Sequence, residues 1–152
     1  MSTSLSSVTD QLLQGKKVIC PNRGTSMLPL LRQGKDLMVI SPRPDSRLKK
    51  YDALLFKRDN GDLVLHRVLK VLEKGYLMNG DHQIVKETVR EDQILGIMTH
   101  VMRGKKLIPV TSLRMRCYIH LWYAPYPLRC LFLRANGKLH GIKRRILKAR
   151  KA

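Results

Sequence analysis

Short hydrophobic stretches separated by turn residues make up most of the first 110 positions. Leu5, Val8, Leu12 and Leu13 recur at helical spacing, which predicts a short amphipathic helix that ends near Gly15. The stretches that follow are shorter and are typical of strands rather than helices. We expect strands at 16–20, 37–41, 53–57, 63–72, 76–79 and 94–102.

Turn signals fall between these stretches about every ten residues and indicate an antiparallel arrangement. The strongest is Asn60-Gly61, because both residues readily adopt the positive φ of a two-residue hairpin turn. The 63–72 stretch alternates only loosely, as a strand covered on both faces does. We therefore predict a mainly β fold, either an all-β barrel or a folded sheet.

From Ser112 onward, apolar and basic residues alternate at helical spacing. This pattern predicts a cationic helical tail. The chain is thus expected to consist of an N-terminal helix (1–15), a β-domain (16–110) and a basic, aromatic-containing helical tail (111–152).

Composition agrees with one globular domain carrying such a tail. The chain has 152 residues, of which 43% are hydrophobic and 27% charged, enough to bury a core. The net charge of +19 is uneven, because fourteen Lys and Arg lie between Arg103 and Lys151 while no acidic residue follows Asp92. The positive charge is therefore a property of the tail more than of the β-domain.

Several classes of protein are excluded by simple counts. Three cysteines without a CxxC pair argue against a disulfide framework and a cysteine zinc site, and they favour a reducing compartment. No metal or other cofactor is expected.

The N-terminus lacks the charged and apolar regions of a signal peptide. The most apolar stretch, Tyr118–Leu133, contains a histidine, an arginine and two prolines and is a poor membrane span. We expect a cytoplasmic protein, or one bound peripherally at the cytoplasmic membrane.

Four residues are candidates for chemistry. Ser26 lies in a turn between two β segments, and His66 interrupts an apolar strand. Asp81 follows Gly80 at a strand end, and Glu87 comes six positions later. A serine, a histidine and a carboxylate are the nucleophile, base and orienting group of an acyl-transfer site. By type alone the signal is weak, because a serine that caps a turn and a histidine in a core are common.

The order of the surrounding motifs is more specific than the residue types. It resembles the order in the signal peptidase I family, which shares its core with the LexA-type self-cleaving peptidases, and the resemblance covers about residues 17–103. The motifs are Gly24-Thr25-Ser26-Met27-Leu28-Pro29, Gly34-Lys35-Asp36, Leu48-Lys49-Lys50-Tyr51-Asp52, Val64-Leu65-His66-Arg67-Val68, Gly80-Asp81 and Ile94-Leu95-Gly96.

The resemblance implies a role for each candidate. Ser26 would be the nucleophile, with its own backbone N–H as the oxyanion donor. His66, followed by Arg-Val, matches the histidine base of the endoplasmic-reticulum and archaeal type. A carboxylate beyond Gly-Asp supports the base in that type, and either Asp81 or Glu87 fills this place. The implied substrate has small residues before the cut and binds as an extended strand along a sheet edge.

The expected function is a serine endopeptidase that cleaves leader or signal-like peptides. Family members carry spanning helices before the serine, whereas no such stretch precedes Ser26 here, so the topology stays open. One alternative is a non-catalytic peptide-binding module with a lipid- or nucleic-acid-binding tail. The other is a self-cleaving peptidase of the LexA branch.

The tail permits three interpretations. Aromatic residues beside many cations are typical of an interfacial membrane anchor, where each Lys or Arg contributes about 1 kcal/mol near an anionic surface. The same cations attract nucleic acid. A helix packed on the β-domain with a solvated basic end is the third. We favour peripheral membrane contact over nucleic acid; the pattern gives no indication of the oligomeric state.

Overall fold

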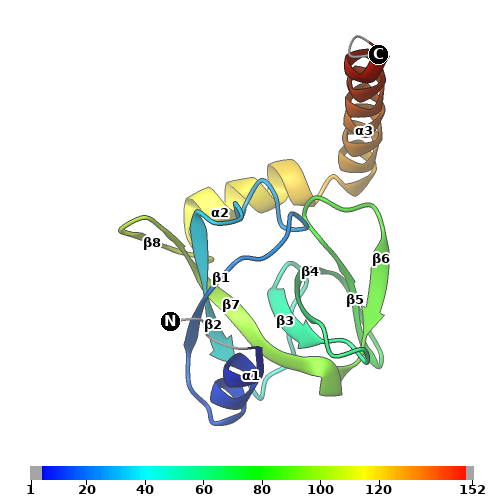
Figure 1. Cartoon of the computed structure of the whole chain (residues 1–152). Helices are drawn as coiled ribbons and strands as arrows, with labels where there is room; N and C mark the ends of the chain where they lie inside the picture. Colours follow the sequence, from blue (N-terminus) through cyan, green and yellow to red (C-terminus); the bar gives the residue numbers. More distant parts are fainter. Residues whose placement is uncertain (1–4, 150–152) are drawn as a thin grey trace.

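Eight antiparallel strands form a single sheet, with a short helix before it and helices after it (Figure 1). The computed structural model describes residues 5–149, with side chains described for 8–137. The strands run in the order β1-β2-β7-β3-β4-β5-β6, and β8 pairs with β7. The elements are α1 (Leu5–Leu13), β1 (Val18–Pro21), β2 (Asp36–Pro42), β3 (Ala53–Lys57), β4 (Leu63–Leu72), β5 (Gly75–Asn79), β6 (Lys86–Val89), the 3-10 turn η1 (Glu91–Gln93), β7 (Ile94–Arg103), β8 (Lys106–Pro109), α2 (Leu113–Tyr118), the π-helical turn η2 (Ile119–Tyr123) and α3 (Tyr126–Ala149).

The mainly β prediction is confirmed, and the six expected strands are all present. β3 and β4 have the predicted bounds, because a strong apolar run and the hairpin turn between them define both ends. β6 and β8 were not predicted. Each has four residues and only β6 contributes a buried one, so neither shows the apolar alternation that indicates a strand.

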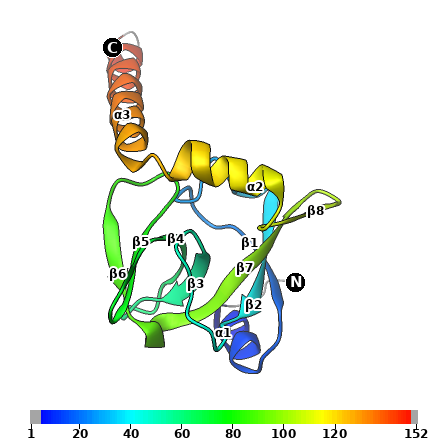
Figure 2. The ribbon, with the colours of Figure 1, turned by 180° about the vertical axis from the view of Figure 1, so that it is seen from behind.

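The sheet separates two hydrophobic cores, and β3 contributes to both. Leu55 packs in a core formed with α1, β1 and β2, whereas Leu54 and Phe56 pack in the other core with β5 and β6. Side chains of a strand alternate between faces, so a strand buried on both faces reads as a continuous apolar run. Views from the two sides show β7 crossing between the β1–β2 side and the β3–β6 side (Figure 2).

The C-terminal helices begin against the β-domain and then leave it. α2 and η2 lie along one end of the domain, opposite α1, and α3 extends away from it (Figure 1). The Tyr123 hydroxyl donates to the Arg67 carbonyl at 3.0 Å, and Met115 is buried in the core with α1. The first part of the expected tail is therefore packed on the domain.

The basic side chains from Lys138 to Lys151 lie outside the described residues. Within the described part of the chain, no helix combines the length and apolarity needed to cross a membrane.

Candidate active site

Ser26 and His66 line the same cavity, which has a volume of about 360 Å³. Its walls come from α1, from strands β1 to β4, from the loop that carries Ser26 and from Gln83 in the loop between β5 and β6. The lining is largely apolar, with Val8, Met38 and Leu55 among the side chains that form it. The fold thus places a hydroxyl and an imidazole from residues 40 positions apart in sequence at one apolar hollow.

Buried neighbours hold the Ser26 turn in place. Met27 and Leu31 are fully buried, so the chain is fixed on the core side of the turn. The buried side-chain amide of Asn22 donates to the carbonyls of Gly24, at 3.1 Å, and Leu31, at 3.3 Å. These contacts tie the two ends of the loop together around Ser26.

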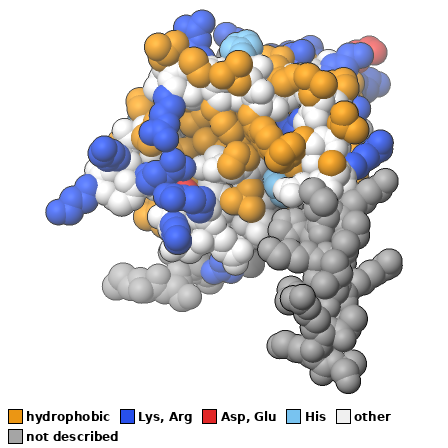
Figure 3. Space-filling model, turned by 90° about the horizontal axis from the view of Figure 1, so that it is seen from above, with side chains coloured by type: hydrophobic (Ala, Val, Ile, Leu, Met, Phe, Trp, Pro, Cys, Tyr) orange, Lys and Arg blue, Asp and Glu red, His pale blue; other side chains and the backbone are white. Residues whose placement is uncertain are grey.

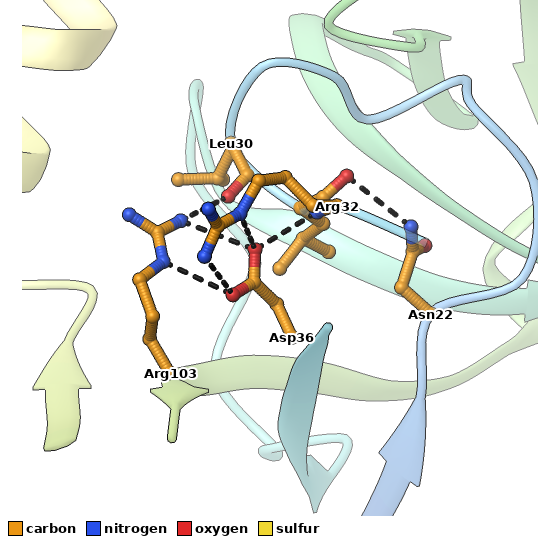
Figure 4. A network of polar contacts seen from close by, with 6 residues as sticks. Asn22, Leu30, Arg32, Asp36 and Arg103 are labelled. Atoms are coloured by element: carbon orange, nitrogen blue, oxygen red, sulfur yellow. Dashed lines mark hydrogen bonds and ion pairs between the residues drawn. The ribbon is translucent and has the colours of Figure 1, made fainter. Parts of the chain in front are cut away.

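A buried carboxylate closes the same loop (Figure 4). Asp36 is fully buried and accepts hydrogen bonds from the Arg32 backbone N–H, at 2.9 Å, and from the guanidinium groups of Arg32 and Arg103. Burial acts to raise the pKa of Asp36, but the hydrogen bonds and charges of the two arginines outweigh it and hold the pKa well below its usual range. The carboxylate is therefore ionised and anchors the loop to β7.

A second segment lies directly against Ser26. The His82 N–H donates to the Ser26 carbonyl at 2.7 Å. A Cβ on Gly80 would lie only 2.7 Å from the same oxygen, a clash that glycine avoids. The Gly80-Asp81 motif is thus needed for close approach of two backbones, and it fixes the Ser26 peptide.

His66 is a buried histidine, with a carboxylate beside its Nδ1. Only 2% of the residue is exposed, and Glu87 Oε1 lies 2.6 Å from Nδ1. The Glu87 oxygen lies off the direction of the ring N–H, so within the described residues the two groups are in close contact without an aligned hydrogen bond. Burial lowers the pKa of His66 despite the opposing charge of Glu87. The ring is therefore neutral near pH 7, the form that a general base requires.

Glu87 is held by an arginine. Arg58 donates from Nε and Nη2 to the two carboxylate oxygens of Glu87, both at 2.9 Å. Burial acts to raise the pKa of Glu87, but the hydrogen bonds and the charge of Arg58 leave it lowered. An ionised Glu87 beside Nδ1 favours the tautomer in which Nε2 is free to accept a proton.

Asp81 lies in a different set of contacts. Its carboxylate accepts two hydrogen bonds from Arg67, both at 3.0 Å, and one from the Tyr118 hydroxyl at 2.8 Å. Its backbone carbonyl accepts from the Trp122 indole N–H at 3.1 Å. Of the two carboxylates considered for the support of His66, the structure brings Glu87 to the ring and places Asp81 between the β-domain and the C-terminal helices.

Two unpaired strand edges border the cavity. Within the part of the chain that the structure describes, β1 pairs only with β2. In the same part, residues 63–66 of β4 pair with β3 alone, because the pairing of β4 with β5 begins at Arg67. Cys20 and Pro21 from β1 and all of residues 63–66 line the cavity. Unpaired backbone groups are therefore available on both sides of the hollow beside Ser26 and His66.

Arg58 was not predicted to be part of the site. It follows β3 in the turn that was identified only as a hairpin signal, 29 positions before Glu87.

Among the described residues, no group of three or more His, Cys, Asp or Glu is placed to hold a metal ion. No protein-family model matches the chain, and no curated protein is similar to it in sequence.

Proposed function

We propose that this chain is a serine endopeptidase of the signal-peptidase type, built on the β-domain that this family shares with LexA-type peptidases. The observation that carries the proposal is the shared cavity of Ser26 and His66, with the ionised Glu87 2.6 Å from His66 Nδ1. A nucleophile, a neutral base and a carboxylate that orients the base are the parts that acyl transfer requires.

The reaction follows from these parts. Ser26 Oγ attacks the scissile carbonyl carbon while His66 Nε2 takes the hydroxyl proton, and the backbone N–H of Ser26 donates to the developing oxyanion. The C–N bond then breaks and His66 returns the proton to the leaving amine. Water attacks the resulting ester through the same base and releases the carboxylate product with free Ser26.

The proposed substrate is a leader or signal-like peptide with small residues before the cut. The free edges of β1 and of residues 63–66 in β4 offer backbone donors and acceptors to an extended peptide lying between them. The apolar lining formed by Met38, Leu55 and Leu65 would receive side chains of that peptide.

The proposal is tested by mass spectrometry of peptide cleavage. A mixed panel of leader peptides is incubated with the full chain, with and without anionic vesicles, beside Ser26→Ala and His66→Ala. Cleavage that both variants lose supports the peptidase and reports its subsite preferences. Peptide binding without cleavage would indicate the binding module instead, and cleavage of the chain itself at rising pH would indicate the self-processing branch.

The pH dependence of cleavage is a further prediction. Because burial lowers the pKa of His66 from its ordinary value of 6.5, the neutral base is formed at lower pH than for a free histidine. We expect kcat/KM to rise with pH and to reach half its plateau below pH 6.5. Initial rates measured from pH 4.5 to 9 test this. A half-maximum above pH 8 would contradict His66 as the base.

We also propose that the C-terminal helices make peripheral contact with an anionic membrane, which would place the protein at the cytoplasmic membrane surface. Leu128, Leu131 and Phe132 follow one another at helical spacing on α3, and each is more than half exposed. Hydrophobic side chains gather on the face that carries α2, with Lys and Arg at its border (Figure 3). Apolar side chains bordered by cations are what an anionic bilayer surface binds.

Vesicle binding tests this surface. Leu128→Ser with Leu131→Ser is expected to weaken binding to anionic vesicles about tenfold or more, because the interface loses two exposed leucines that the bilayer would bury. Leu13→Ser, at a similarly exposed leucine on α1 at the opposite end of the domain, is the matched control and is expected to leave binding unchanged (Figure 1). Equal binding of all three proteins in a sedimentation assay would contradict the proposal.

A further inference from the structure

Arg58 is a charged residue in the cavity wall to which the reaction above assigns no role. It follows β3 in the hairpin that leads to β4, and its backbone N–H is fixed by the Asp62 carbonyl at 2.9 Å. The side chain is 40% exposed, yet it lies in a two-pronged contact with Glu87 rather than in solvent. A planar guanidinium with two parallel N–H donors fixes the plane of a carboxylate as well as its position.

Glu87 connects Arg58 to His66 through a shared oxygen. Oε1 of Glu87 accepts from Arg58 Nη2 at 2.9 Å and lies 2.6 Å from His66 Nδ1. The second oxygen, Oε2, accepts from Arg58 Nε at 2.9 Å. The arginine therefore holds the atom that contacts the base, and both carboxylate oxygens depend on it for their hydrogen bonds.

We propose that Arg58 is a positioning residue for His66: by holding both oxygens of Glu87, it sets where this carboxylate meets the ring and how much of the carboxylate charge acts on it. This inference rests on the proposed peptidase function for its meaning in catalysis. The contact itself is a property of the folded chain and is open to measurement without a substrate.

The charges around His66 give the direction of the effect. Burial of the ring lowers its pKa most, Glu87 raises it by charge and contact, Arg58 lowers it, and the more distant Asp81 raises it. Arg23 and Cys20 are the other ionisable groups that line the cavity wall. Removal of Arg58 leaves Glu87 as an uncompensated negative charge beside the imidazole, which favours the imidazolium. The base would then be protonated over a wider range of pH.

The test is NMR titration of the full chain labelled at histidine. The resonance of His66 is assigned by its loss in His66→Gln. Arg58→Gln is expected to move the His66 titration upward by about 0.5 pH unit or more, since a full charge is removed two contacts away from the ring. Arg58→Lys keeps the charge without the fork and is expected to give a smaller shift. Glu87→Gln is expected to move the titration downward.

The chain offers a matched control. Arg43 donates to the carboxylate and the carbonyl of Glu91, another partly buried arginine–carboxylate contact, and Arg43 does not line the cavity. Arg43→Gln is expected to leave the His66 titration unchanged. In a Glu87→Gln background, Arg58→Gln is expected to move the His66 titration upward by less than it does in the parent chain, because only the direct charge of Arg58 then acts on the ring.

The outcomes separate this inference from the proposed function. An unmoved His66 titration in folded Arg58→Gln overturns the inference, whether or not the chain cleaves peptides. If Arg58→Gln does not fold, Arg58→Lys against Arg43→Lys decides the same question. In the cleavage assay, the acid limb is the rise of kcat/KM with pH. If this limb moves to higher pH in Arg58→Gln by the same amount as the His66 titration, the result supports the positioning role of Arg58 in catalysis. Cleavage with an unmoved acid limb overturns it and leaves the peptidase proposal intact.

Discussion

Replacing Ser26 by alanine is expected to lower kcat for peptide cleavage about 10⁶-fold, to the background rate of the assay. Alanine removes the Oγ that attacks the carbonyl and changes no buried contact, because the surrounding loop is held by Asn22, Asp36 and backbone hydrogen bonds. His66→Ala is expected to cost a similar factor, since nucleophile and base act as one unit. Rates are measured with the best peptide from the panel.

A second serine, Ser41, provides the control. Ser41 in β2 has a buried hydroxyl without a hydrogen-bond partner among the described residues. Ser41→Ala removes an unsatisfied polar group and is expected to leave cleavage and stability unchanged or slightly improved. Retained cleavage in Ser26→Ala, at a rate above one hundredth of the parent, would contradict the role of Ser26.

Asp81→Ala is expected to lower the free energy of unfolding by about 3–5 kcal/mol, the cost of leaving a buried charge without its partner. Arg67 is 1% exposed and would lose both hydrogen bonds from its guanidinium to the carboxylate. Tyr118 would lose its acceptor as well, which loosens α2 from the domain. Urea unfolding, followed by circular dichroism, measures the change.

Glu87→Gln is the matched comparison, because Glu87 is a carboxylate also held by an arginine but 26% exposed at its side chain. It is expected to lose most of its cleavage activity while its free energy of unfolding stays close to that of the parent chain. The opposite pattern, a stable Asp81→Ala without activity and an unfolded Glu87→Gln, would assign the support of His66 to Asp81.

Much of the β-domain was predictable because its strands carry strong local signals. β4 is an apolar run after an Asn-Gly turn, and the predicted bounds agree with the observed ones. β6 and β8 escaped prediction because short strands at a sheet edge or beyond it expose most of their side chains and lose the alternation that marks a strand.

The candidate site was predictable only in part. The motif order pointed to Ser26 and His66, and the structure brings both to one cavity. The choice between Asp81 and Glu87 depends on which carboxylate faces which strand, and this follows from the pairing of β5 with β6, where Glu87 lies opposite Met78. The pairing of β5 with β6 could not be predicted from local sequence patterns, because β6 is too polar to be recognised as a strand.

The aromatic residues of the tail show a different limit. Tyr118 and Trp122 lie among cations, as in an interfacial belt, yet both donate hydrogen bonds to Asp81. An amphipathic ring serves a membrane interface and a buried polar network equally well, because each offers an apolar body and one donor. The burial of Asp81 and Arg67 decides in favour of the polar network for these two rings, and this burial cannot be predicted from the sequence.

Detection of an acyl-enzyme at Ser26 is the most direct test of the proposed peptidase mechanism. An activated ester of a short peptide with a small C-terminal residue is mixed with the full chain, the reaction is quenched in acid, and the adduct is mapped by mass spectrometry. We expect an acyl group on Ser26, formed far more slowly in His66→Ala and absent in Ser26→Ala. Ester or peptide hydrolysis without an adduct on Ser26, or an adduct formed equally fast without His66, would contradict it.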